Sequence, residues 1–277
     1  MRGQESLTFN DVPGNLSGSL WATHFQFLND TSEMQYGLDG ARAVANAPAN
    51  QVPDEKRRFL RDTEEILDHT FEHKIAPPYV FSFCGVGDLL GQWREYGGGG
   101  SGFSIAFDYK ELSGLFDGPT GALPITYDPT DQRDILSATV EAYWETFLRW
   151  EHRCEQRFCL PSAPEREGSI EDHCQYNLVS LLVTELATFK NPGFKEEREW
   201  RLFRWGEGSS PRKFRTGRFG VIPYIELSPP QGQKLPIKKV IQGPTADRSS
   251  AKRSVKMLLE DFGYAGVEVE VSTIPLR

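Results

Sequence analysis

The sequence predicts an α+β fold of mixed, mostly antiparallel sheets flanked by helices. Short runs rich in aromatic and β-branched residues, typical of strands, occur near the start of the chain and again after residue 198. Longer segments between residues 54 and 189 repeat apolar side chains at helical spacing. No internal repeat and no clear linker interrupts the 277 residues. We therefore expect a single α+β domain over residues 1–277, with a helical insertion around 131–189.

In the first 108 residues, turn-forming residues separate the expected elements. Pro13, Gly14 and Gly18 make residues 1–18 irregular, and Pro77-Pro78 ends a charged helix. Asn29 to Ser32 have the composition of a turn and helix cap. In chain order we expect a strand at 19–25, a loop at 40–53, a helix at 54–73, a strand at 79–84, a helical turn at 89–96, a glycine loop at 97–100 and a strand at 102–108.

The second half of the chain changes from helices to short strands. Leu136, Val140 and Phe147 follow helical spacing, so they predict a core-facing stripe on a long helix. After Asn191-Pro192-Gly193 the apolar runs become short and strand-like. We expect helices at 131–160, 170–189 and 248–262, and strands at 199–205, 219–227, 237–242 and 265–272.

Composition excludes several classes of protein. Hydrophobic residues make up 38% and aromatic residues 12%, which is typical of a globular chain rather than a disordered one. Apolar runs fall short of the roughly 20 residues of a membrane helix. The N-terminal segment lacks the apolar core of a signal peptide. Four cysteines are too few for a disulfide scaffold of this length, so we expect a cytoplasmic protein without a membrane partner.

Charge is distributed unevenly along the chain, whose net charge is −8. Residues 190–277 carry 17 Lys and Arg against 10 Asp and Glu, whereas the first 189 residues carry 14 against 29. A basic C-terminal third is consistent with a phosphate-bearing ligand, and equally with docking against the acidic part of the same chain. The overall acidity argues against broad nucleic-acid binding.

A group of soft side chains raises the question of zinc. His152, Cys154, Cys159, His173 and Cys174 fall within 23 residues, but their spacing matches no zinc-finger pattern. Their helical context favours thiols on helix faces. We therefore expect no metal.

The segment Phe194 to Arg201 is the first candidate for chemistry. If residues 197–203 are extended, Glu197, Glu199 and Arg201 share one face of a strand. Acids beside an arginine can hold a carboxylate for base or electrostatic work. The alternative is a solvated run of charges. The neighbouring Trp200 and Leu202 favour a strand that enters the core.

Two further groups are weaker candidates. Gln92, Trp93, Arg94 and Tyr96 suit stacking on a planar ligand with a phosphate contact, although a core tryptophan with a surface arginine explains this segment better. His24 with Asn29, Asp30 and Glu33 could face a pocket, and a helix cap with a surface histidine explains them equally well.

The order of the motifs resembles the bacterial family called domain of unknown function 2971. The resemblance covers most of the chain, and the first three motifs are specific in wording and order. The segments that carry it are SLWATHFQFLNDTSEMQYGL (19–38), VFSFCGVGDLLGQWREYGGGGSGFSIAFD (80–108), FKNPGFKEEREWRLF (189–203), LPIKKVIQGP (235–244) and VSTIPLR (271–277).

A second resemblance, to ADP-ribosyltransferases, concerns chemistry. Members of the family usually begin with a strand reading Leu-Tyr-His-Tyr-Thr, and that opening with a late glutamate is similar to the ADP-ribosyltransferase layout. There an early His or Arg holds the ribose of NAD, and the glutamate stabilises the ribosyl cation. By this analogy Glu197 or Glu199 is the late acid, and Gln92, Trp93, Arg94 and Tyr96 line the cleft.

This chain departs from that layout at its start, where no such strand or histidine precedes Ser19. Residues Leu7 to Phe9 are a candidate replacement for the strand, and His24 is a candidate substitute for the missing ribose ligand. If the first strand were lost, an edge of the sheet would be open.

The resemblance to ADP-ribosyltransferases implies an NAD-dependent ADP-ribosyltransferase or NAD glycohydrolase, with the role of a toxin or phage-defence effector. NAD is the expected substrate, and a protein or nucleic acid the expected acceptor. The catalytic candidates are Glu197, Glu199 and Arg94, and the binding candidates are His24, Asn29, Gln92, Trp93, Tyr96 and Arg201.

Two alternatives remain open. The chain could be a non-enzymatic nucleotide- or partner-binding module, with saturable binding in the basic third at Arg212, Lys213, Arg215 and Arg218. It could also be a nucleic-acid-processing enzyme that uses the acidic cluster with a divalent metal.

Overall fold

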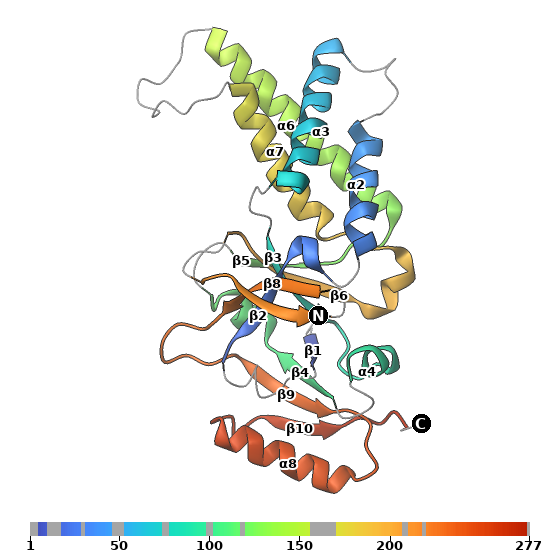
Figure 1. The fold of residues 1–277 in the computed structure, drawn as a ribbon, viewed down its shortest axis with the longest axis vertical. Coiled ribbons are helices and arrows are strands. Elements are labelled where there is room, and N and C mark those ends of the chain that lie inside the picture. The colour runs from blue at the N-terminus through green and yellow to red at the C-terminus, as the bar shows by residue number, and fades with distance from the viewer. Residues whose placement is uncertain are drawn as a thin grey trace. The chain divides into compact units, whose positions relative to one another are not determined.

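A computed structural model describes residues 5–9, 18–28, 31–45, 53–73, 78–97, 102–116, 120–155, 170–206, 210–217 and 220–275. The chain forms two compact units, and each is assembled from separate stretches of sequence. A β-sheet unit comprises residues 1–28, 78–125 and 193–277, and a helical unit comprises residues 29–77 and 126–192 (Figure 1).

The β-sheet unit confirms the predicted α+β class with mostly antiparallel strands. The described strands form one sheet with the path β10-β9-β4-β1-β3-β2-β8-β7, while β6 pairs with β3 and β5. Every pair is antiparallel except β9 with β10. The strands are β1 (Glu5–Phe9), β2 (Leu20–His24), β3 (Tyr79–Cys84), β4 (Phe103–Phe107), β5 (Thr120–Pro124), β6 (Glu199–Arg204), β7 (Lys213–Gly217), β8 (Gly220–Leu227), β9 (Ile237–Gln242) and β10 (Glu268–Val271).

Strand β3 is the point at which this sheet divides. Strand β6 pairs with all of β3 from Tyr79 to Cys84 and so occupies one edge. Because a strand has two edges, β1 and β2 share the other one. Strand β1 pairs with β3 at Cys84 and with β4 along its other edge. Strand β2 pairs with β3 at Tyr79 and Val80 and with β8 along its other edge.

The two faces of the sheet around β3 carry different side chains, because alternate residues point to opposite faces. One face carries Leu20, Phe81, Leu202 and Ile225, which belong to the main hydrophobic core. Helices α5 (Tyr109–Ser113) and α8 (Arg248–Asp261) add Leu112, Val255 and Leu259 to this core. We call it the core face, and the other the polar face.

Two helices in this unit, α5 and α8, begin at an aspartate that caps the first turn. Asp108 accepts hydrogen bonds from the backbone N–H of Lys110 and Glu111 at 3.0 and 3.1 Å, which begins α5. Asp247 accepts from the N–H of Ser250 at 3.0 Å and begins α8. These caps orient the helices over the strands that they cover.

The helical unit contains α2 (Thr31–Ala45), α3 (Asp54–His73), α6 (Pro129–Glu155) and α7 (Ile170–Leu186) (Figure 1). Its core includes Phe59 of α3, whose ring lies 5.5 Å from that of Trp144 and 5.2 Å from that of Phe147. Leu178 and Leu182 of α7 are buried in the same unit. The helix expected at 131–160 is thus confirmed as far as Glu155, and residues 156–160 lie outside the described residues.

Some elements differ from the sequence prediction. Residues 1–18, expected to be irregular, contain strand β1, which lies between β3 and β4. Strand β1 includes Leu7 to Phe9, so the candidate replacement for the first strand is confirmed as a strand. Residues 40–45, expected in a loop, continue helix α2. Strands β5 and β7 and helix α5 were not predicted, because they are short and strand pairing or packing decides their structure.

Candidate functional site

Glu199 and Arg201 form a buried ion pair on β6. The Nε of Arg201 lies 2.6 Å from Oε1 of Glu199, and the two side chains are 2% and 7% exposed. They lie on the polar face of the sheet, opposite Ser82 and Cys84 of β3. The period of two thus brings this acid and this arginine together as predicted. Since both charges are buried, each depends on the other for compensation.

Glu197 does not share that strand. Residues Pro192–Glu197 form a short 3₁₀ helix, and Arg198 with φ of 48° separates it from β6. The condition for Glu197 to share a face with Glu199 and Arg201, an extended chain over 197–203, is therefore not met. The carbonyl of Glu197 accepts a hydrogen bond from Sγ of Cys84 at 2.9 Å, and the N–H of Gly85 donates to the carbonyl of Arg198 at 2.9 Å. These contacts hold the turn against the end of β3.

The four candidates of helix α4 (Leu90–Tyr96) have different environments. Trp93 is buried, and its Nε1 donates to Oδ1 of Asp88 at 2.7 Å. A Cβ on Gly243 would lie 3.1 Å from the Trp93 ring, so this indole packs closely against backbone. Arg94 is exposed, while Gln92 and Tyr96 are half-buried. Trp93 therefore serves packing, and its ring is not presented to a ligand.

His24 ends β2 on the core face, directly opposite Tyr79. Its ring lies edge-on to Tyr79 at 5.4 Å and to Phe27 at 5.3 Å. Asn29 lies outside the described residues. The structure thus places His24 on a different face and different strands from the Glu199–Arg201 pair.

A cluster on the polar face combines a cation with two aromatic rings. The guanidinium carbon of Arg215 lies 5.5 Å from the ring centre of Tyr224 and 6.0 Å from that of Trp21. The two rings are 5.0 Å apart, and NH2 of Arg215 donates to Oγ1 of Thr23 at 2.8 Å. We call Trp21, Thr23, Arg215 and Tyr224 the stacked-arginine cluster.

The electrostatics of this cluster favour an anion. Burial lowers the pKa of Arg215 from its ordinary value, which shows that the protein surroundings disfavour its charge. In the described part of the chain, no carboxylate pairs with Arg215. The neighbouring Lys213 is already paired with Glu226, at 2.8 Å. The cluster therefore holds a half-buried positive charge that lacks an ionic partner.

Sequence reasoning grouped Arg215 with other basic residues but missed its aromatic neighbours. Trp21 and Thr23 alternate with the core residues Leu20 and Ala22, so the period of two indicates that they face away from the core. Their meeting with Tyr224 and Arg215, about 200 positions later, follows from the pairing of β2, β8 and β7. No local sequence pattern predicts that these three strands pair with one another.

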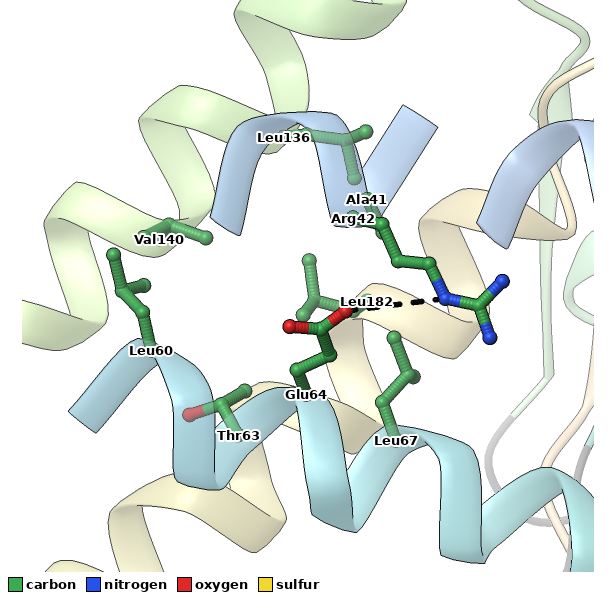
Figure 2. A pocket seen from close by; sticks show the side chains of 9 residues that line it. All are labelled: Ala41, Arg42, Leu60, Thr63, Glu64, Leu67, Leu136, Val140 and Leu182. Carbon is green, nitrogen blue, oxygen red and sulfur yellow. Dashed lines mark ion pairs between the residues drawn. The ribbon is translucent and has the colours of Figure 1, made fainter. Parts of the chain in front are cut away.

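Enclosed space in either unit is small. A pocket of about 20 Å³ in the helical unit is lined mainly by aliphatic side chains, with Arg42 Nε 3.9 Å from Oε1 of Glu64 (Figure 2). A second pocket of about 10 Å³, lined by Phe83, Phe107 and Leu202, lies in the β-sheet unit. Such volumes suit about one water molecule at most. Neither of these two pockets has room for a nucleotide.

Across the described ranges, no group of three or more His, Cys, Asp or Glu side chains could hold a metal ion. The side chains of His152, Cys154, Cys159 and His173 lie outside the described residues, and Cys174 is buried as a free thiol. Within the part of the chain that the structure describes, no helix has the length and apolarity to cross a membrane.

Comparisons with known proteins match one family, whose function is unknown. No curated protein and no solved structure matches the chain. The model of one family, described as protein of unknown function (DUF2971), matches residues 92–202. This stretch contains most of α4 and also Glu197, Glu199 and Arg201. None of these comparisons supports a likeness to ADP-ribosyltransferases. Residues 92–202 are therefore similar to the DUF2971 family, the family that the sequence motifs predict.

Proposed function

We propose that this protein binds a nucleotide-type ligand at the stacked-arginine cluster. The observation that carries the proposal is Arg215, a half-buried cation that lies over two aromatic rings and has no carboxylate partner in the described structure. An anion placed there gains a charge-assisted hydrogen bond from a donor that is already desolvated.

The aromatic component favours a nucleotide over a simple anion. A planar base can stack on tryptophan, tyrosine or guanidinium planes, and such stacking is largely independent of base identity. Thr23 accepts from one of the five N–H donors of Arg215, which leaves donors for phosphate oxygens. Trp21 is half-buried, so part of its ring faces solvent. Ring and phosphate recognition thus lie side by side.

Calorimetric titration with NAD, ADP-ribose and ATP tests this proposal. We expect saturable binding of at least one of them, and at least a tenfold loss of affinity in Arg215→Gln. Adenosine should bind more weakly, because it lacks the phosphate. Arg253→Gln on the exposed surface of α8 is the matched control and should bind normally. Absence of heat with all three ligands, or equal affinity in Arg215→Gln, would refute the proposal.

A second candidate function is NAD cleavage or ADP-ribosyl transfer, in the role of a toxin or phage-defence effector. The observation in its favour is Glu199, a carboxylate on a late strand that Arg201 holds in one position. An anionic, fixed carboxylate is the group that would stabilise a developing oxocarbenium ion. Its burial means that NAD must reach it by displacing the residues that cover it. The acceptor would be a protein or a nucleic acid.

An assay that measures nicotinamide release from NAD by chromatography tests this second candidate. We expect Glu199→Gln to abolish release, because the neutral amide no longer stabilises positive charge. Glu260→Gln, at an exposed carboxylate of α8, is the matched control and should leave the release unchanged. Release that is unchanged in Glu199→Gln, with folding verified by circular dichroism, would exclude Glu199 as the catalytic acid.

A further inference from the structure

Arg204, at the end of β6, lies in a row of polar side chains that crosses three strands. It is directly opposite Tyr79 of β3, and Tyr79 is directly opposite His24 of β2. Directly opposite residues in antiparallel strands have their side chains on the same face, about 5 Å apart at Cβ. The three side chains therefore emerge together on the core face, next to its apolar cluster. We call Arg204, Tyr79 and His24 the polar row.

Arg204 is unusual because its Nε is buried and finds no hydrogen-bond partner among the described residues. The residue as a whole is 8% exposed. No ion pair involves Arg204 in the described residues, in contrast to Arg201 two positions earlier. Burial of an unpaired cation costs several kcal/mol, so proteins rarely keep one without a counter-ion. The unused donor therefore indicates a missing anionic partner.

A second guanidinium reaches the same row. Nε of Arg212 donates to the hydroxyl of Tyr79 at 3.0 Å. Arg212 is exposed, while Tyr79 is only 1% exposed, so Arg212 connects the buried row to solvent. Two arginines beside a tyrosine and a histidine provide several donors and a positive charge of at least two. This donor set suits a compact, multiply charged oxyanion.

We infer that the polar row, together with Arg212, is a binding site for a phosphate group. This site is separate from the stacked-arginine cluster. Trp21, Thr23 and Tyr224 lie on the polar face, whereas Ala22, His24 and Tyr79 lie on the core face. The phosphate is free inorganic phosphate or the phosphoryl group of a small phosphomonoester, since the chemistry of recognition is the same for both.

Thermal unfolding of the full chain in phosphate-free buffer tests this inference. Inorganic phosphate and glycerol phosphate are added in separate titrations, with chloride at matched ionic strength as reference. We expect a rise in Tm of several degrees with at least one phosphate, because a ligand that binds only the folded state stabilises it. No rise beyond that in chloride with either phosphate would overturn the inference.

Variants test whether the phosphate-dependent rise in Tm depends on the polar row. Arg204→Met should lose the phosphate-dependent rise in Tm, each protein being compared with its own phosphate-free baseline. If Arg204→Met does not fold, Arg204→Lys serves in its place, because lysine keeps the positive charge. By calorimetry, Arg204→Lys should bind phosphate at least tenfold more weakly than the natural protein. Arg212→Gln should reduce the rise, and Arg253→Gln on the exposed surface of α8 should retain it in full. A full rise in Arg204→Met or Arg204→Lys, or its loss in Arg253→Gln, would contradict the assignment.

Discussion

Three arginines of the β-sheet unit show how surroundings decide what a buried cation does. Arg201 is neutralised by Glu199, and the pair is closed to solvent. Arg215 lies over two rings and keeps unused donors near the surface. Arg204 is buried, and no partner for its Nε is found among the described residues. Because desolvation must be offset, the first arginine is structural and the other two are candidates for ligand binding.

Glu185 of the helical unit gives a prediction at the residue scale. Burial raises its pKa above the ordinary 4.5, although a hydrogen bond from Thr139 opposes the shift. The folded protein thus retains this proton to higher pH than the unfolded chain. Stability therefore falls as pH rises from the ordinary pKa through the raised one.

Glu185→Gln removes this loss of stability at high pH, because the amide does not ionise. Its side chain keeps an oxygen that can accept the hydrogen bond from Thr139. Thermal unfolding should show a higher Tm than the natural protein at neutral pH, with the difference vanishing below the ordinary glutamate pKa. A lower Tm of the variant at neutral pH would mean that the charge is stabilising.

The described cysteines give a second prediction at this scale. Burial raises the pKa of the Cys84 and Cys174 thiols, which lowers the fraction of reactive thiolate. Both should resist alkylation by iodoacetamide in the native protein and react after unfolding. Mass spectrometry of the labelled peptides measures this directly. Rapid native labelling of Cys84 would show that the contact with the Glu197 carbonyl opens readily.

At the scale of elements, we expect the stability of strand β6 to depend on the Glu199–Arg201 ion pair. Glu199→Ala leaves Arg201 buried without its partner, which should cost about 3–5 kcal/mol in the free energy of unfolding. Replacing both residues by leucine should cost less than Glu199→Ala, because no buried charge remains. Urea unfolding of the single and double variants measures the difference. A single variant within about 1 kcal/mol of the natural protein would show that water reaches this pair.

The segment between β3 and α4 depends on Asp88. Its carboxylate accepts hydrogen bonds from Nε1 of Trp93 at 2.7 Å, Oγ of Ser272 at 2.6 Å and the N–H of Thr273 at 3.2 Å. It thereby joins helix α4 to the chain that follows β10. Asp88→Ala leaves the buried indole N–H without an acceptor, which should cost about 1–3 kcal/mol.

Asp88→Asn is the control for that change, because its amide oxygen can still accept from Trp93. Chemical unfolding followed by tryptophan fluorescence should place it between Asp88→Ala and the natural protein. Equal stability of Asp88→Ala and the natural protein would show that this hydrogen-bond network adds nothing.

Local sequence patterns predicted some elements well and others not at all. Strand β3 and helix α3 have the bounds predicted for them. Four aromatic or β-branched residues specify the strand, and a clear helical stripe specifies the helix. Strands β1 and β5 are short and contain polar or small residues, so their neighbours in the sheet specify them. The 3₁₀ helix before β6 was missed because charged residues fit either conformation.

The candidate sites were only partly predictable for the same reason. The period of two brought Glu199 and Arg201 together from sequence alone, since both lie on one strand. The stacked-arginine cluster and the polar row each require residues from three strands, far apart in the chain. Register across the sheet, which depends on the packing of the whole unit, determines those contacts.

At the scale of the whole molecule, both proposed sites belong to the β-sheet unit, which contains the basic C-terminal third. Residues 190–277 carry an excess of seven positive charges on a chain whose net charge is −8. A local excess of positive charge of this kind would favour the approach of an anionic ligand to this part of the chain. The helical unit has a small apolar pocket and a packed aromatic core, which suit a structural role.

The central claim is that this protein binds a nucleotide-type ligand through Arg215. Calorimetric titration with ADP-ribose, performed on the natural protein and on Arg215→Gln, tests it most directly. We predict saturable binding by the natural protein and a loss of affinity of at least tenfold in the variant. Equal affinity in both proteins would contradict the claim and place the ligand elsewhere on the chain.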